Sequence, residues 1–131
     1  MDQDFIDKLP PDVQKEYLKI AIKLSEKEKQ TKIQEDFLTF VKHVWPEFIE
    51  GKHHKEIADK FNDIANKKIK RLIINMPPRH TKSEFASFLL PAWMVGRRPN
   101  LKIIQTTHTT ELAIRFGRKA KTLMELHLYD H

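Results

Sequence analysis

Apolar residues recur at helical spacing in four parts of the chain, with charged residues between them. The spacing predicts amphipathic helices over residues 12–29, 34–45, about 53–66 and 111–126. Pro46 and Gly51 separate the second helix from the third. The first helix carries Val13, Tyr17, Ile20, Ala21 and Leu24 on one face. The residues expected to face inward on the other three are Phe37, Phe40, Val41, Val44, Ile57, Phe61, Ile64, Leu112, Ala113, Phe116, Ala120 and Leu123.

Two short apolar runs have a different character. Leu72–Ile74 and Leu101–Gln105 are rich in β-branched residues, which is typical of buried parallel strands. Between them, apolar residues at 85, 88, 89, 92 and 93 predict a further helix, with a kink or break at Pro91. Strand, helix and strand in this order predict a βαβ unit with a right-handed crossover, and so an α/β fold.

The first predicted strand leads into a loop with candidate chemistry. Met76-Pro77-Pro78 ends the strand, and Thr81-Lys82-Ser83 precedes the helix, which is the order of a phosphate-binding P-loop. Loop amides and a helix N-terminus offer donors to phosphate oxygens, a lysine adds a full charge, and a serine hydroxyl can ligate Mg²⁺. Met76 and Thr81 occupy the positions where the standard pattern has glycine. An ordinary strand-turn-helix with an incidental Lys-Ser therefore remains the alternative.

A family resemblance favours the P-loop interpretation. Residues 77–84, PPRHTKSE, resemble the PPRHGKSE phosphate-binding loop of the large terminase subunit of tailed bacteriophages. Residues 103–121, IIQTTHTTELAIRFGRKAK, resemble that family's second strand and following helix, and FVKHVWPEF resembles its entry region. The resemblance covers about residues 37–126. Thr81 departs from the family's glycine, which puts nucleotide affinity and turnover in doubt.

The resemblance implies an incomplete P-loop NTPase-type parallel sheet preceded by an N-terminal helical segment. Residues 1–33 would form a helical arm, and residues 34–131 the first part of a P-loop ATPase domain. We expect the family's acidic strand and nuclease domain to lie beyond this chain. Hydrolysis needs a residue that positions the attacking water, so we expect little or no ATP turnover and no nuclease activity from these residues alone.

The function implied is ATP binding in a DNA-packaging motor, which couples ATP hydrolysis to movement of double-stranded DNA into a procapsid. ATP and Mg²⁺ are the expected cofactors. Lys82 and Arg79 would stabilise phosphate charge as catalytic residues, and Ser83 would bind the metal. The residues expected to hold the nucleotide are Pro78, Arg79, His80, Thr81, Lys82 and Ser83.

The same resemblance implies the partners and the location. Double-stranded DNA, a portal protein and a small terminase subunit are the expected partners, and the intact protein would form a homo-oligomeric ring. The location expected is the host cytoplasm, with transient attachment at the procapsid portal. No apolar run reaches the roughly 20 residues needed to cross a bilayer, so no membrane association is expected.

Charge is distributed unevenly along the chain. Residues 1–66 carry 11 Lys/Arg and 14 Asp/Glu, a net charge of −3, whereas residues 67–131 carry 13 and 4, a net charge of +9. The positive half contains the phosphate loop and the basic run 67–71, so its field would attract the phosphates of nucleotides and nucleic acids. Solubility, or a surface that faces another protein, is the simpler explanation.

Two alternatives to the packaging motor follow from the same residues. A helicase-like P-loop ATPase would share the loop, and a non-catalytic basic domain with a vestigial loop would share the charge. His53-His54 suggests a metal site, but no third ligand is evident; a core or surface histidine, or one close to the nucleotide base, accounts for the pair.

Overall fold

The computed structural model describes residues 3–77 and 82–127. The chain divides into two compact units, Met1–Lys32 and Ile33–His131. Each unit is described by itself. Among the described residues no helix is both long and apolar enough to cross a membrane.

The first unit consists of two helices, α1 (Gln3–Ile6) and most of α2 (Pro11–Glu35). The side chain of Gln14 joins them by donating from Nε2 to the carbonyl oxygens of Ile6 and Leu9, each at 2.9 Å. α2 extends past the predicted end at residue 29 and contains no buried residue.

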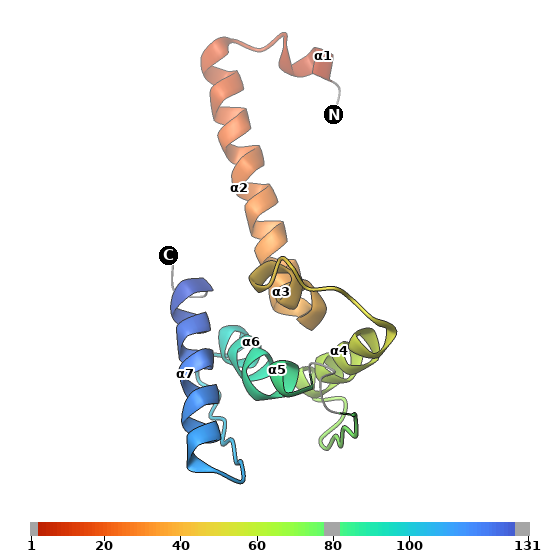
Figure 1. Ribbon diagram of the computed structural model, residues 1–131. Coiled ribbons are helices and arrows are strands. Elements are labelled where there is room, and N and C mark those ends of the chain that lie inside the picture. Colours follow the sequence, from red (N-terminus) through yellow and green to blue (C-terminus); the bar gives the residue numbers. More distant parts are fainter. Residues whose placement is uncertain (1–2, 78–81, 128–131) are drawn as a thin grey trace. The chain divides into compact units, whose positions relative to one another are not determined.

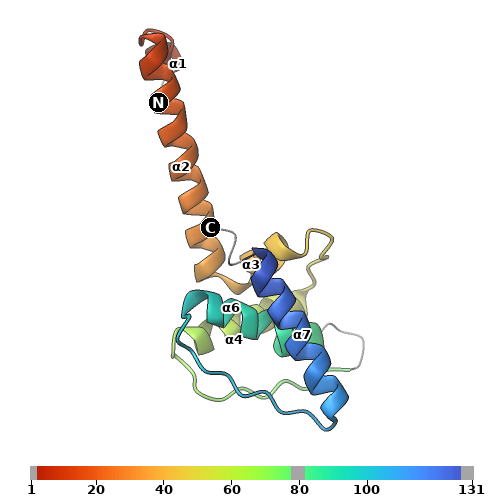
Figure 2. The same cartoon turned by 90° about the vertical axis from the view of Figure 1, so that its left-hand side faces the viewer.

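The second unit is built from helices around one aromatic core. Its elements after α2 are α3 (Phe37–Val44), α4 (Lys52–Ala65), α5 (Lys82–Glu84), η1 (Phe85–Leu89), α6 (Leu90–Arg97) and α7 (Thr110–His127). α3 contacts α4 and α6, and α7 lies along η1 and α6 (Figures 1 and 2). The helices predicted over 34–45, 53–66 and 111–126 are therefore confirmed, with ends shifted by one to three residues.

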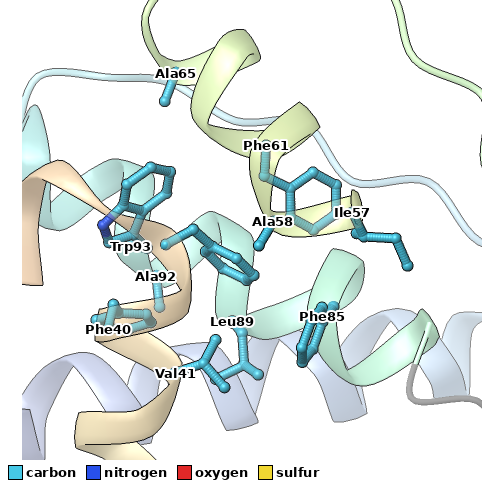
Figure 3. Close-up of a cluster of buried hydrophobic side chains, with 11 residues drawn as sticks. Phe40, Val41, Ile57, Ala58, Phe61, Ala65, Phe85, Leu89, Ala92 and Trp93 are labelled. Atoms are coloured by element: carbon cyan, nitrogen blue, oxygen red, sulfur yellow. The ribbon is translucent and has the colours of Figure 1, made fainter. Parts of the chain in front are cut away.

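Side chains from α3, α4, η1 and α6 form the core, and Figure 3 shows how they interdigitate. The Phe37 ring is fully buried and meets Phe61, Phe85 and Trp93 edge-on, with centroid separations of 5.1, 5.4 and 5.4 Å. The other buried members are Phe40, Val41, Ile57, Ala58, Ala65, Leu89 and Ala92.

The prediction of an α/β fold is wrong. Within residues 3–77 and 82–127 there is no β-strand, and the described chain is all-helical. Leu72–Ile74 and Leu101–Gln105 are irregular segments, and no backbone hydrogen bond joins them. They line separate grooves that share the helical residues Ala86, Ser87 and Leu90. The two segments therefore lie beside the same helix and are not paired with each other as strands, which would lie about 4.8 Å apart. The predicted βαβ unit and parallel sheet do not form.

The first of these segments nevertheless keeps the alternation of a strand. From Arg71 to Pro77, exposed residues alternate with half-buried ones, so Leu72, Ile74 and Met76 face the helices and Ile73 is 86% exposed. The apolar run is therefore satisfied by packing on one side against helices. The composition predicted burial inside a sheet, and the segment is instead partly buried against the helices.

Of the kink or break predicted at Pro91, the break does not occur. α5, η1 and α6 follow one another without interruption from Lys82 to Arg97. Proline cannot donate a backbone hydrogen bond and its ring crowds the preceding turn. The turn before it is a π-helix in which Leu90 N–H donates to the Phe85 carbonyl, five residues back. The wider turn accommodates the proline and continues the helix.

Asp36 fixes the relation of α3 to α4. Its Oδ2 accepts from the backbone N–H and the hydroxyl of Thr39, at 2.8 and 2.7 Å, and so caps α3. Its Oδ1 accepts from Asn62 Nδ2 at 2.8 Å, and Asn62 Oδ1 in turn accepts from Phe37 N at 2.9 Å. This polar network therefore holds the start of α3 against α4, next to the core.

The same network predicts acid sensitivity. Burial alone would raise the pKa of Asp36, but the hydrogen bonds from Thr39 and Asn62, with the charge of Lys42, hold this pKa below its ordinary value of 3.8. The stabilisation is therefore present above the unfolded-state pKa of about 3.9 and is lost as the pH falls through the folded-state pKa.

We expect Asp36→Ala to lower the free energy of unfolding at pH 7 by about 1 kcal/mol, the usual cost of losing an N-cap. The difference from the unsubstituted protein should shrink as the pH falls below 4. Urea unfolding followed by circular dichroism at a series of pH values measures both effects. The control Asp59→Ala removes an exposed carboxylate on α4. Equal pH dependence in the two variants would contradict the role given to Asp36.

Candidate functional site

Four of the predicted nucleotide-binding residues, Pro78, Arg79, His80 and Thr81, lie outside the described residues. The roles predicted for them, including the catalytic role of Arg79, stay predictions. Lys82 and Ser83 are described, and they form the first turn of α5.

Lys82 reaches back toward the residue where the preceding segment ends. Its Nζ lies 3.5 Å from the carbonyl oxygen of Met76, six residues earlier. The lysine side chain is half-buried, and within the described part of the chain it forms no ion pair. A partly desolvated ammonium group with a neutral acceptor is a good partner for an anion, because a charge-assisted hydrogen bond is stronger than a neutral one.

Lys82 and Ser83 line one end of a groove between α4, η1 and the segment before the loop. Its volume is about 360 Å³. Phe61, Ile64, Leu72, Ile74, Ala86, Ser87 and Leu90 form the rest of the lining. No acidic side chain is among these residues. The Ser83 side chain is exposed, so its hydroxyl is accessible to a ligand from solution.

Glu84 follows in the same turn, and its nearest cation comes from another helix. Lys119 Nζ on α7 lies 3.8 Å from Glu84 Oε2, and the same ammonium lies 5.3 Å from the centre of the Phe88 ring. Lys119 thus sits over the helix that begins at Lys82. Lys119 is therefore the ion-pair partner of Glu84 among the described residues.

His54 is a core histidine, one of the alternatives that the sequence left open. It is 7% exposed, and its Nδ1 accepts a hydrogen bond from Gly51 N at 2.8 Å, which caps the start of α4. Its ring packs against Phe48 and Phe85, with centroids 4.8 and 5.2 Å away. His53 lies beside it, with ring centroids 3.8 Å apart. Among the described residues no group of three His, Asp or Glu side chains is placed to hold a metal ion.

The fold also brings together two basic stretches that are far apart in the sequence. Arg97 Nη2 donates to Asn66 Oδ1 at 2.9 Å, and Arg98 Nη2 donates to the Ala65 carbonyl at 3.4 Å. These contacts place the end of α6 beside the turn after α4, where the basic run begins. We call the group the basic cluster; its members are Lys67, Lys68, Lys70, Arg71, Arg97 and Arg98.

Residues 106–109 lead into the last helix, α7, which begins at Thr110. Thr109 Oγ1 accepts from Leu112 N at 3.3 Å, and Thr107 Oγ1 donates to the Thr109 carbonyl at 2.6 Å. Thr109 therefore caps the start of α7.

Comparison with known proteins adds no family to these observations. No protein-family model matches the chain, and no curated protein and no solved structure matches it. The terminase resemblance therefore rests on the loop and helix residues quoted above.

Proposed function

We propose that Lys82 and Ser83 bind the phosphates of Mg-ATP, and that the chain is the ATP-binding part of a DNA-packaging motor ATPase of the terminase type. The observation that carries the proposal is the position of the Lys82 ammonium, half-buried and 3.5 Å from the Met76 carbonyl. This contact places a positive charge next to the residue that precedes residues 77–84, the segment whose sequence resembles the terminase phosphate loop.

The chemistry of the site suits a triphosphate. The amine at Lys82 is a point charge with three donors, and one weak contact to a carbonyl leaves it able to turn toward a phosphate oxygen. Ser83 offers a hydroxyl in the first turn of a helix that runs on to Arg97, and hydroxyl oxygens are suitable ligands for Mg²⁺. The bound metal would supply neutralisation of phosphate charge. The helix start adds favourable partial positive charge.

Calorimetric titration with Mg-ATP tests the proposal. We expect binding by the unsubstituted chain and a loss of about tenfold to a hundredfold in affinity in Lys82→Ala, because a hydrogen bond to a charged group contributes about 1.5–3 kcal/mol. Lys121→Ala is the matched control, since the Lys121 side chain is 74% exposed. The control should bind as tightly as the unsubstituted chain. No binding by the folded chain, or equal affinities in all three proteins, would overturn the proposal.

The basic cluster supports a second candidate, a domain that binds nucleic acid without using nucleotide. Its six cations come from two stretches held together by Arg97 and Arg98, and within the described residues none of them forms an ion pair. Phosphodiester backbones are bound by such surfaces with a strong dependence on salt. DNA binding that weakens with salt, and that neither Mg-ATP nor Lys82→Ala alters, would favour this candidate.

A further inference from the structure

Helix α2 carries an apolar stripe in which three side chains are exposed and the fourth, Tyr17, is half-buried. Val13, Tyr17, Ile20 and Leu24 follow one another at intervals of four, three and four residues, which places them on one face. Val13, Ile20 and Leu24 are 44, 52 and 57% exposed. Alternating intervals of three and four are the spacing of the seam between two helices in a coiled coil.

The charges beside the stripe indicate what covers it. Both signs occur along α2, with lysines at 15, 19, 23, 27, 29 and 32 and acidic residues at 12, 16, 26, 28 and 35. Helices that lie on anionic membranes carry mainly basic residues on the polar face. A mixed surface is complementary instead to another mixed surface, and a second copy of the same helix provides one.

We propose that two copies of this chain associate through the α2 stripe in antiparallel orientation. In this register Val13 packs on Leu24 of the second copy, and Tyr17 packs on the second copy's Ile20. All four apolar layers are then filled. Glu16 and Lys23 occupy equivalent positions flanking the seam, and antiparallel packing sets Glu16 of each copy beside Lys23 of the other.

The parallel arrangement is less favourable for the same sequence. It would align the apolar layers equally well, but the next seam position is Lys27. Parallel packing would place this lysine directly against Lys27 of the second copy, and like charges facing each other are unfavourable. In the antiparallel register Lys27 instead lies opposite Pro10, the residue before α2 begins. A parallel pair would also set Lys23 beside Glu28 of the second copy, so the repulsion between the two Lys27 side chains in the seam is what favours the antiparallel pair.

Cysteine crosslinking tests the arrangement directly, because the chain contains no cysteine. Val13→Cys and Leu24→Cys are prepared separately, mixed as full-length chains and oxidised mildly. We expect the mixed disulfide, identified by mass, to form at least fivefold more than either self-crosslinked dimer. Ile22→Cys, on the opposite face of the helix, is the control and should crosslink at the background level of random collision. Preferential self-crosslinking of Val13→Cys or Leu24→Cys, or crosslinking at the control level, would overturn the proposal.

A charge reversal gives an independent readout by sedimentation equilibrium. Glu16→Lys should raise the dimer dissociation constant about tenfold, since two symmetric attractions become repulsions. Adding Lys23→Glu to the same chain should restore it. Glu28→Lys is the control, because Glu28 would face Lys23 only in a parallel pair, and it should leave the constant unchanged. A chain that stays monomeric at all concentrations, or a stronger effect of Glu28→Lys than of Glu16→Lys, would overturn the antiparallel dimer.

Discussion

Replacing Phe37 with alanine is expected to lower the free energy of unfolding by about 3–5 kcal/mol, the range for truncation of a buried aromatic residue. Phe37 is 0% exposed, and its ring meets aromatic rings from α4, η1 and α6. This one side chain therefore packs α3 against all three of these elements. Its removal leaves a cavity that rigid aromatic neighbours fill poorly, so we expect a cost in the upper part of the range.

Urea unfolding followed by far-ultraviolet circular dichroism measures the effect. Phe5→Ala is the matched control, because it makes the same chemical change at a position that is 58% exposed. The control should change the free energy of unfolding by less than about 0.5 kcal/mol, as exposed substitutions generally do. Equal unfolding midpoints for the two variants would contradict the core assignment of Phe37.

The helices of the second unit could be predicted because their signal is local. An apolar stripe with a period near 3.6 residues identifies both the helix and its buried face. Phe37, Phe40 and Val41, predicted to face inward, are buried in α3. Asp36, three residues before Thr39, is also a typical N-cap residue. This local signal predicts the observed start of α3 at Phe37.

The two segments were wrongly predicted as strands because a strand depends on a neighbour that lies elsewhere in the chain. The β-branched composition of Leu72–Ile74 suits an extended backbone, and the segment does alternate between exposed and half-buried residues. Whether it joins a sheet depends on non-local pairing, which composition does not encode. The structure satisfies the same apolar residues against helices.

The candidate site shows the same division between local and distant information. The sequence placed Lys82 and Ser83 at a helix start, and the structure confirms this position, while their role in binding stays a prediction. It did not identify the contact from Lys82 to the Met76 carbonyl, nor the joining of Arg97 to Asn66. Both depend on how the chain returns on itself, and neither residue pair shares a periodic pattern.

Trp93 provides the second large effect, because it combines buried area with a specific hydrogen bond. The residue is 2% exposed, its ring lies 5.4 Å from that of Phe37, and its Nε1 donates to the Ile33 carbonyl at 3.0 Å. The Arg97 guanidinium lies 4.9 Å from the ring centre. We expect Trp93→Ala to lower the free energy of unfolding by about 3–5 kcal/mol.

Trp93→Phe separates the two contributions. Phenylalanine keeps an aromatic ring in the core but leaves the Ile33 carbonyl without the indole donor, so we expect a smaller loss of about 1–3 kcal/mol. Trp45→Phe is the control, since Trp45 is only half-buried, and it should cost less than Trp93→Phe. Urea unfolding followed by circular dichroism compares all three variants without depending on tryptophan fluorescence. If Trp93→Phe proved as costly as Trp93→Ala, the hydrogen bond to the Ile33 carbonyl rather than the packed ring would dominate the contribution of Trp93 to stability.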